Sequence, residues 1–136
     1  MLTEKDVRAY VADSTVADND GLPLYFSPAE IAEAMKRAAR AFNSIPPLIL
    51  RVSGDALPDD TNMFLDAAAA QLFTAELNKL TRRDIDYSAG GVQSPIERAR
   101  INHLKDLIKF HTELFTAAAK AFKMTQNIAR AFRHYR

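Results

Sequence analysis

The sequence predicts a mainly α-helical domain, a small bundle of about four helices with one long C-terminal helix. Two segments, Ser27-Pro28-Ala29-Glu30 and Ser94-Pro95-Ile96-Glu97, combine a capping serine, proline at the first helical position and glutamate at the third. No glycine or proline occurs after residue 95. The 136 residues are 48% apolar with only four glycines, which suits a single domain with one modest core.

A short first helix is expected near residues 4–13. Thr3 can cap it, acids follow in its first turn, and apolar residues then recur at helical spacing. Residues 14–26 carry Asp18-Asn19-Asp20-Gly21 and Pro23, which favour turns over helix. We therefore expect a loop between the first two helices.

The second helix should cover about residues 28–44. Its apolar residues line one face, formed by Ile31, Met35, Ala38 and Phe42. Pro46-Pro47 ends it, because proline lacks an amide hydrogen and disfavours helix in the residue before it. Residues 48–52 are expected to form a short strand or an extended packing segment, and a lone strand has no obvious partner for pairing.

A third helix is predicted from a cap at Asp60 or Thr61 to about Thr81. Its apolar stripe is Leu65, Ala68, Leu72, Ala75 and Leu80, and its run of alanines from 67 to 70 lets another helix approach closely. Residues 82–92 break the pattern and contain adjacent glycines. They predict a shaped loop, at most a minor β-hairpin.

The fourth helix should begin at residue 95 and run nearly to the C-terminus. Two apolar stripes with strict 3–4 spacing follow it. The first is Ile101, Leu104, Ile108, His111, Phe115, Ala118, Phe122, Thr125, Ala129 and Phe132. The second is Leu107, Phe110, Leu114, Ala117, Ala121, Met124, Ile128, Ala131 and Tyr135. Together they are wider than one partner helix can cover, so the helix should touch neighbours on two sides.

Length indicates that this helix extends past its own domain. About 36 residues would span roughly 54 Å, whereas a domain of this size has a radius of gyration of about 14 Å. We therefore predict that residues 120–136 project as a basic and apolar segment, and that deleting them leaves a folded domain that cannot assemble. The proposed partner interface is Lys120, Phe122, Lys123, Met124, Ile128, Arg130, Phe132, Arg133, Tyr135 and Arg136.

Charge is distributed unevenly along the chain. Residues 97–136 hold nine Lys or Arg and three acids, a net charge of +6, whereas the rest of the chain carries −5. The basic end could contact nucleic acid phosphates, with Phe132 and Tyr135 stacking on bases. Docking into an acidic groove of a protein is favoured, because these aromatics continue the same stripes as the core residues.

The sequence contains no recognisable catalytic, cofactor or metal site. It has no cysteine, and His103, His111 and His134 fit no metal-binding pattern. His111 lies in an apolar stripe, which predicts a hydrogen-bonded interior or interface imidazole. Phosphate-binding glycine loops and nucleophile elbows are absent from the sequence. We expect a protein that is not an enzyme, and the sequence shows neither an apolar leader nor a membrane-spanning run.

Two segments resemble small virion structural proteins of tailed bacteriophages. Residues 25–47 are similar to a capped helix that ends in Phe-Asn and Pro-Pro. Residues 82–92 resemble the Arg-Asn, apolar, Tyr-Ser-x-Gly-Gly loop before the long C-terminal helix of those proteins, with Asp84 in place of Asn. The Lys-Lys pair often found late in that helix is only partly matched by Lys120 and Lys123.

The resemblance implies a protein of the virion neck, a head-to-tail adaptor that joins portal to tail. It implies a cyclic homo-oligomer, a dodecameric ring, that contacts the portal protein, another neck or tail protein and, in the channel, DNA. Assembly would take place in the host cytoplasm, without a membrane partner. The alternatives are a tail or baseplate component, or a helical nucleic-acid-binding protein that uses its basic C-terminus.

Overall fold

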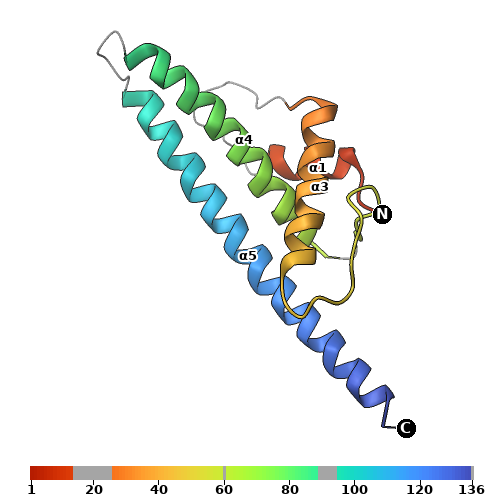
Figure 1. Cartoon of the computed structure of the whole chain (residues 1–136). Helices are drawn as coiled ribbons and strands as arrows, with labels where there is room; N and C mark the ends of the chain where they lie inside the picture. The colour runs from red at the N-terminus through yellow and green to blue at the C-terminus, as the bar shows by residue number, and fades with distance from the viewer. Residues whose placement is uncertain (14–25, 60, 89–94, 136) are drawn as a thin grey trace.

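The fold of the chain was obtained as a computed structural model that describes residues 1–13, 26–59, 61–88 and 95–135. This part is mainly helical, as the sequence predicts, with four helices and no strand among the described residues. The helices are α1 (Glu4–Asp13), α3 (Pro28–Ser44), α4 (Met63–Ser88) and α5 (Pro95–Arg133). Helices α4 and α5 run antiparallel, and α1 and α3 pack near the start of α4 (Figure 1).

Helix α3 begins and packs as its sequence indicates. The Ser27 hydroxyl accepts a hydrogen bond from the Glu30 amide at 3.2 Å, and the Glu30 carboxylate accepts one from the Ser27 amide at 2.8 Å, which completes a capping box. The predicted apolar face of α3 is buried. It packs on α4, where the alanines from 67 to 70 are all buried, and small side chains let the two helices approach closely.

Residues 48–52 form no strand, and of the two expected alternatives the packing segment is the one observed, with Leu50 and Val52 against the core. Leu50 has a φ angle of 57°, in the left-handed region, which a strand does not permit. The Asn43 side chain instead satisfies the backbone here: its amide donates to the Val52 carbonyl and its oxygen accepts from the Val52 amide, both at 2.9 Å. One side chain thus takes the place of a strand partner.

Helix α4 is longer than predicted, because it continues past Thr81 to Ser88. Residues 82–88 contain no glycine or proline, so nothing in them forces the backbone out of the helix. Helix α5 begins at Pro95 as predicted and has 39 residues. Residues 14–25 of the loop predicted at 14–26, and the glycine pair at 90 and 91, lie outside the described residues.

The N-terminus is tied to the segment that precedes α4. The Leu2 amide donates to the Leu57 carbonyl at 2.7 Å, and the terminal ammonium lies 2.8 Å from the Asp59 carboxylate. Gly54 lies close to α3, because a Cβ placed on it would lie 2.6 Å from the Cα atom of Lys36. The chain therefore packs against α3 at Val52 and Gly54.

Candidate docking surface on the C-terminal helix

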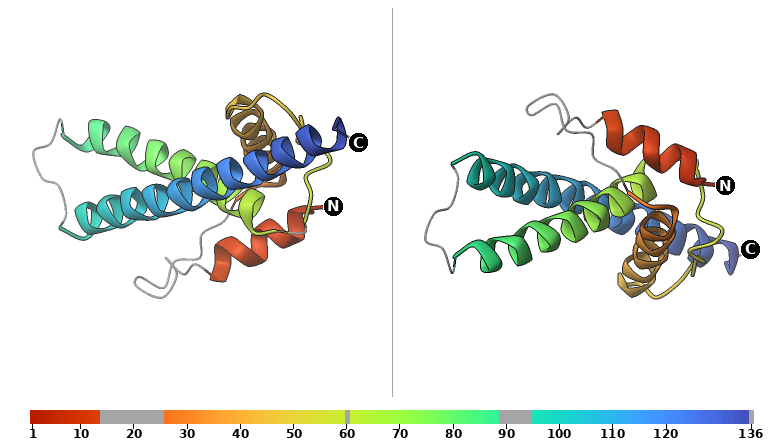
Figure 2. Two further views of the ribbon diagram at one scale, coloured as in Figure 1. Left: turned by 90° about the horizontal axis from the view of Figure 1, so that it is seen from below. Right: turned by 90° about the horizontal axis from the view of Figure 1, so that it is seen from above.

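Helix α5 is covered by the rest of the chain on one side only. Its buried residues recur mainly at intervals of four and face the bundle: Leu104, His111, Phe115, Ala119 and Lys123. The second predicted stripe faces the opposite way and is exposed from Phe110 onward. Seen from below, α5 crosses in front of the start of α4, with α1 to one side (Figure 2). The sequence predicts neighbours on two sides of this helix, and the chain itself supplies them on one side only.

We call the uncovered residues the α5 stripe. They are Phe110, Leu114, Ala117, Ala121, Met124, Ile128, Ala131 and Tyr135. Their larger side chains are between 43% exposed, at Leu114, and 92% exposed, at Tyr135. From Phe110 to Ala131 the stripe follows one continuous helix for about 32 Å. Tyr135 lies in the turn after α5, where its amide still bonds the Phe132 carbonyl at 3.4 Å.

The sequence-predicted interface residues fall into three groups. The exposed group is Lys120, Phe122, Met124, Ile128, Arg130, Phe132, Arg133 and Tyr135. Phe122 also packs inward, with its ring 6.3 Å from that of Phe42. Arg136 lies outside the described residues. Lys123 is the exception, because it is completely buried.

The sequence placed Lys123 on the partner interface, but in the structure this side chain makes its contacts within the chain. Its ammonium donates to the carbonyls of Phe42 and Ile45, each at 2.6 Å, at the end of α3. The ammonium also lies 4.4 Å from the centre of the Phe42 ring. Helix C-termini leave carbonyls without intrahelical partners, and a cation there also interacts favourably with the helix dipole. Lys123 therefore caps α3 from α5.

Burial disfavours the charged form of Lys123 and lowers the pKa of its ammonium from the usual 10.5. Among the residues that the structure describes, no carboxylate pairs with Lys123. Sequence reasoning placed it in the basic tail by its charge. Its position, four residues after the small Ala119 and eight after Phe115, is the feature that could have identified it as part of the buried side.

His111 is buried, as its place in an apolar stripe predicts. Its Nδ1 lies 2.8 Å from Oδ1 of Asp66, and the Tyr10 hydroxyl donates to the same oxygen at 2.5 Å. Burial, with the hydrogen bond to Asp66 next, raises the pKa of the Tyr10 hydroxyl. Asp66 and Tyr10 did not stand out in the sequence, because each lies alone among apolar residues. Together the three side chains tie α1 and α4 to α5.

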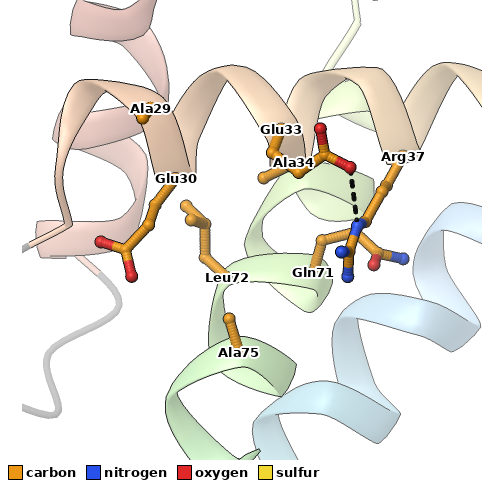
Figure 3. A pocket seen from close by; sticks show the side chains of 8 residues that line it. All are labelled: Ala29, Glu30, Glu33, Ala34, Arg37, Gln71, Leu72 and Ala75. Carbon is orange, nitrogen blue, oxygen red and sulfur yellow. Dashed lines mark hydrogen bonds and ion pairs between the residues drawn. The ribbon is translucent and has the colours of Figure 1, made fainter. Parts of the chain in front are cut away.

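A cavity of about 300 Å³ lies between α3 and α4 (Figure 3). Alanines and Leu72 form much of its wall, and its two carboxylates already have partners. Glu33 lies 3.1 Å from Arg37, and Glu30 forms an ion pair with Lys79. No nucleophile or imidazole lines it. The cavity is therefore an apolar recess whose two carboxylates are paired with cations. It does not explain the exposed stripe on α5.

Comparisons with protein-family models, curated proteins and solved structures found no match to this chain. Among the described residues, no group of three or more His, Asp or Glu side chains is placed to hold a metal ion. None of the helices within those residues is long and apolar enough to cross a membrane. Among the described residues, five of the nine exposed large hydrophobic side chains belong to the α5 stripe, which makes it the candidate docking surface.

Proposed function

We propose that this chain is a structural subunit that works by docking its α5 stripe on another subunit of an assembly. The supporting observation is the size of the uncovered apolar surface. With about 200 Å² for a large side chain, the exposed fractions of the stripe and of neighbouring Phe132 correspond to roughly 700 Å². Soluble monomers rarely expose a continuous apolar patch larger than a few hundred Å².

The resemblance to tailed-phage virion proteins gives this proposal its finer form, a head-to-tail adaptor in the neck. Such a subunit carries out no chemistry and transmits contact between portal and tail. Two features support this: the folded part is small and helical, and α5 continues past the bundle after its last half-buried residue, Gln126 (Figure 1). A tail or baseplate component would use the same features.

Protein docking is favoured over nucleic-acid binding. Lys120, Arg130 and Arg133 are exposed, but Lys123 is buried on the carbonyls of α3 and is not available to a phosphate. The apolar residues between them form one ordered stripe, which is the pattern of a helix-binding surface. Binding to phosphates would not need this stripe.

The test compares association of the full chain with that of matched variants. Met124→Glu with Ile128→Glu places two charges on the stripe, whereas Thr125→Glu with Ala129→Glu places them one residue along, on another face. All four positions are exposed, so both proteins should keep the circular dichroism of the parent. Light scattering then measures mass for each protein alone and mixed with a candidate portal protein.

We expect the parent and the control variant to associate and the stripe variant to remain monomeric. Apolar docking should persist as salt rises, whereas binding to DNA should weaken steeply across the same salt series. A parent protein that stays monomeric alone and with every neck or tail component would refute the proposed function. Association that survives in the stripe variant would show that another surface is responsible.

A further inference from the structure

We propose that the α5 stripe binds the α5 stripe of a second copy of this chain, with the two helices antiparallel. The inference deepens the proposed function and rests on it, because it names the occupant of the same surface. It follows from the order of large and small residues along the stripe, from the exposed area and from the position of the charges.

The spacing of the stripe requires a helix as its partner. Its eight residues, from Phe110 to Tyr135, alternate steps of four and three, the spacing of a heptad repeat. This is the repeat by which side chains of one helix fill the gaps between those of another. All eight positions are exposed, on a different face of α5 from its buried residues, so a second helix can lie along them.

The antiparallel order matches large residues with small ones. When Ala121 faces Met124 of the second copy, the remaining layers follow from the spacing. These layers are Phe110 with Tyr135, Leu114 with Ala131, and Ala117 with Ile128. Each alanine therefore faces a long side chain, which fills the space between two helices evenly.

Other arrangements of the same two helices pack poorly. In a parallel, in-register pair each residue meets its own copy, so Ala117, Ala121 and Ala131 leave gaps while the large residues crowd one another. Sliding the antiparallel pair by one heptad opposes Ala117 to Ala121 and Leu114 to Met124. The proposed register avoids layers of alanine against alanine, which a shift by one heptad in either direction creates.

Charge favours the same orientation. No acid follows Glu113, and Lys120, Arg130 and Arg133 are exposed on the C-terminal half of α5. A parallel pair would bring the arginines of both copies together, whereas an antiparallel pair places Arg130 and Arg133 of the two copies at opposite ends. In the proposed register Glu113 flanks His134 of the second copy, and Lys120 flanks Asn127.

The area is sufficient for a stable pair. Without Phe132, the exposed fractions of the stripe correspond to about 600 Å² from each copy and about 1,200 Å² in total, at the lower end of the range of specific protein interfaces, roughly 1,200–2,000 Å². Such a contact is two-fold symmetric and uses both stripes completely. A pair of this kind joins two copies only, so assembly of such pairs into a ring would need further contacts.

Cysteine cross-linking tests the orientation directly, because the chain has no cysteine of its own. Ala117→Cys and Ile128→Cys are made as separate proteins. A disulfide needs Cα atoms within about 7 Å. In the antiparallel pair residue 117 of one copy faces residue 128 of the other, whereas two copies of the same variant keep their cysteines about 16 Å apart, from 11 residues at 1.5 Å each.

We expect a cross-linked dimer after oxidation of the mixture and almost none from either variant alone. Sedimentation of the parent should give twice the 15.2 kDa chain mass, and Ile128→Glu should shift it to the monomer while Ala129→Glu does not. Cross-linking of each variant alone, with no disulfide between residues 117 and 128 in the mixture, would show a parallel pair and overturn the inference. A monomer that still binds a portal protein through the stripe would overturn the pairing and leave the proposed function standing, whereas a monomer that binds nothing would refute both.

Discussion

Replacing Lys123 by methionine tests whether this buried lysine holds α5 to the bundle. Methionine keeps the apolar stem against Phe42 but removes the two 2.6 Å hydrogen bonds to carbonyls at the C-terminal end of α3. Hydrogen bonds from a charged donor contribute roughly 1.5–3 kcal/mol each. The variant loses these bonds, but it also no longer buries an ammonium, and the desolvation cost that it avoids offsets part of the loss. The Phe42 carbonyl also retains its bond from the Ile45 amide at 3.2 Å.

We therefore expect Lys123→Met to lower the free energy of unfolding by about 1–3 kcal/mol at neutral pH. Urea denaturation followed by circular dichroism measures this, with Lys120→Met as the control because Lys120 is exposed on the same helix. A variant as stable as the control would mean that the cost of burying the charge equals the gain from its hydrogen bonds. Lys123 would then not be a stabilising cap, and that part of the account would be refuted.

The pH dependence gives the same variant a second readout. Burial lowers the pKa of Lys123 in the folded state below its usual 10.5. At a pH between the lowered pKa of the folded state and the ordinary pKa of the unfolded state, Lys123 is protonated in the unfolded chain but neutral in the folded one. The unfolded chain then binds more protons than the folded chain, so rising pH stabilises the folded protein. The neutral amine still donates to both carbonyls. The stability of the parent relative to Lys123→Met should therefore increase as pH rises through this window, and Tyr10, whose pKa is raised in both proteins, cancels in the difference.

Three further substitutions test contacts within the bundle, each by urea denaturation. Tyr10→Phe removes the hydroxyl that donates to Asp66 and should cost about 1–3 kcal/mol, because a buried carboxylate loses a donor; an unchanged midpoint would show that water replaces it. Asn43→Ala leaves the amide and carbonyl of Val52 without their partner and should also cost about 1–3 kcal/mol, whereas the exposed Ser44→Ala should cost less. Ser27→Ala breaks the capping box of α3 and should cost about 1 kcal/mol, with Ser53→Ala as a surface control.

Sequence patterns predicted the four described helices and the two faces of α5, but not the end of α4. The Ser27-Pro28 and Pro95 starts fix where α3 and α5 begin, and the 3–4 spacing on α5 separates its two faces. Spacing alone could not show which face the chain covers, because that depends on where α3 and α4 pack. Only the contacts at α3 show that α5 remains part of the bundle as far as Lys123.

This result changes the expected boundary of the projecting segment. The sequence placed it at residues 120–136, but Lys123 is buried and Phe122 packs on Phe42, so deletion from residue 120 would remove part of the bundle. A deletion that begins after Gln126, the last half-buried residue of α5, should leave the fold intact. Charge and polarity misled the prediction, because a lysine that caps a helix looks in sequence like a lysine in water.

Solvent access at one position of the stripe tests the central claim most directly. Ile128→Cys and Ala129→Cys each provide the single thiol of the protein, one on the stripe and one on a neighbouring face. The rate of maleimide labelling is measured for dilute protein and for the associated form. The account predicts that association slows labelling severalfold at position 128 and leaves position 129 nearly unchanged. Equal rates at position 128 in both forms would contradict it, because the stripe would then remain uncovered in the assembly.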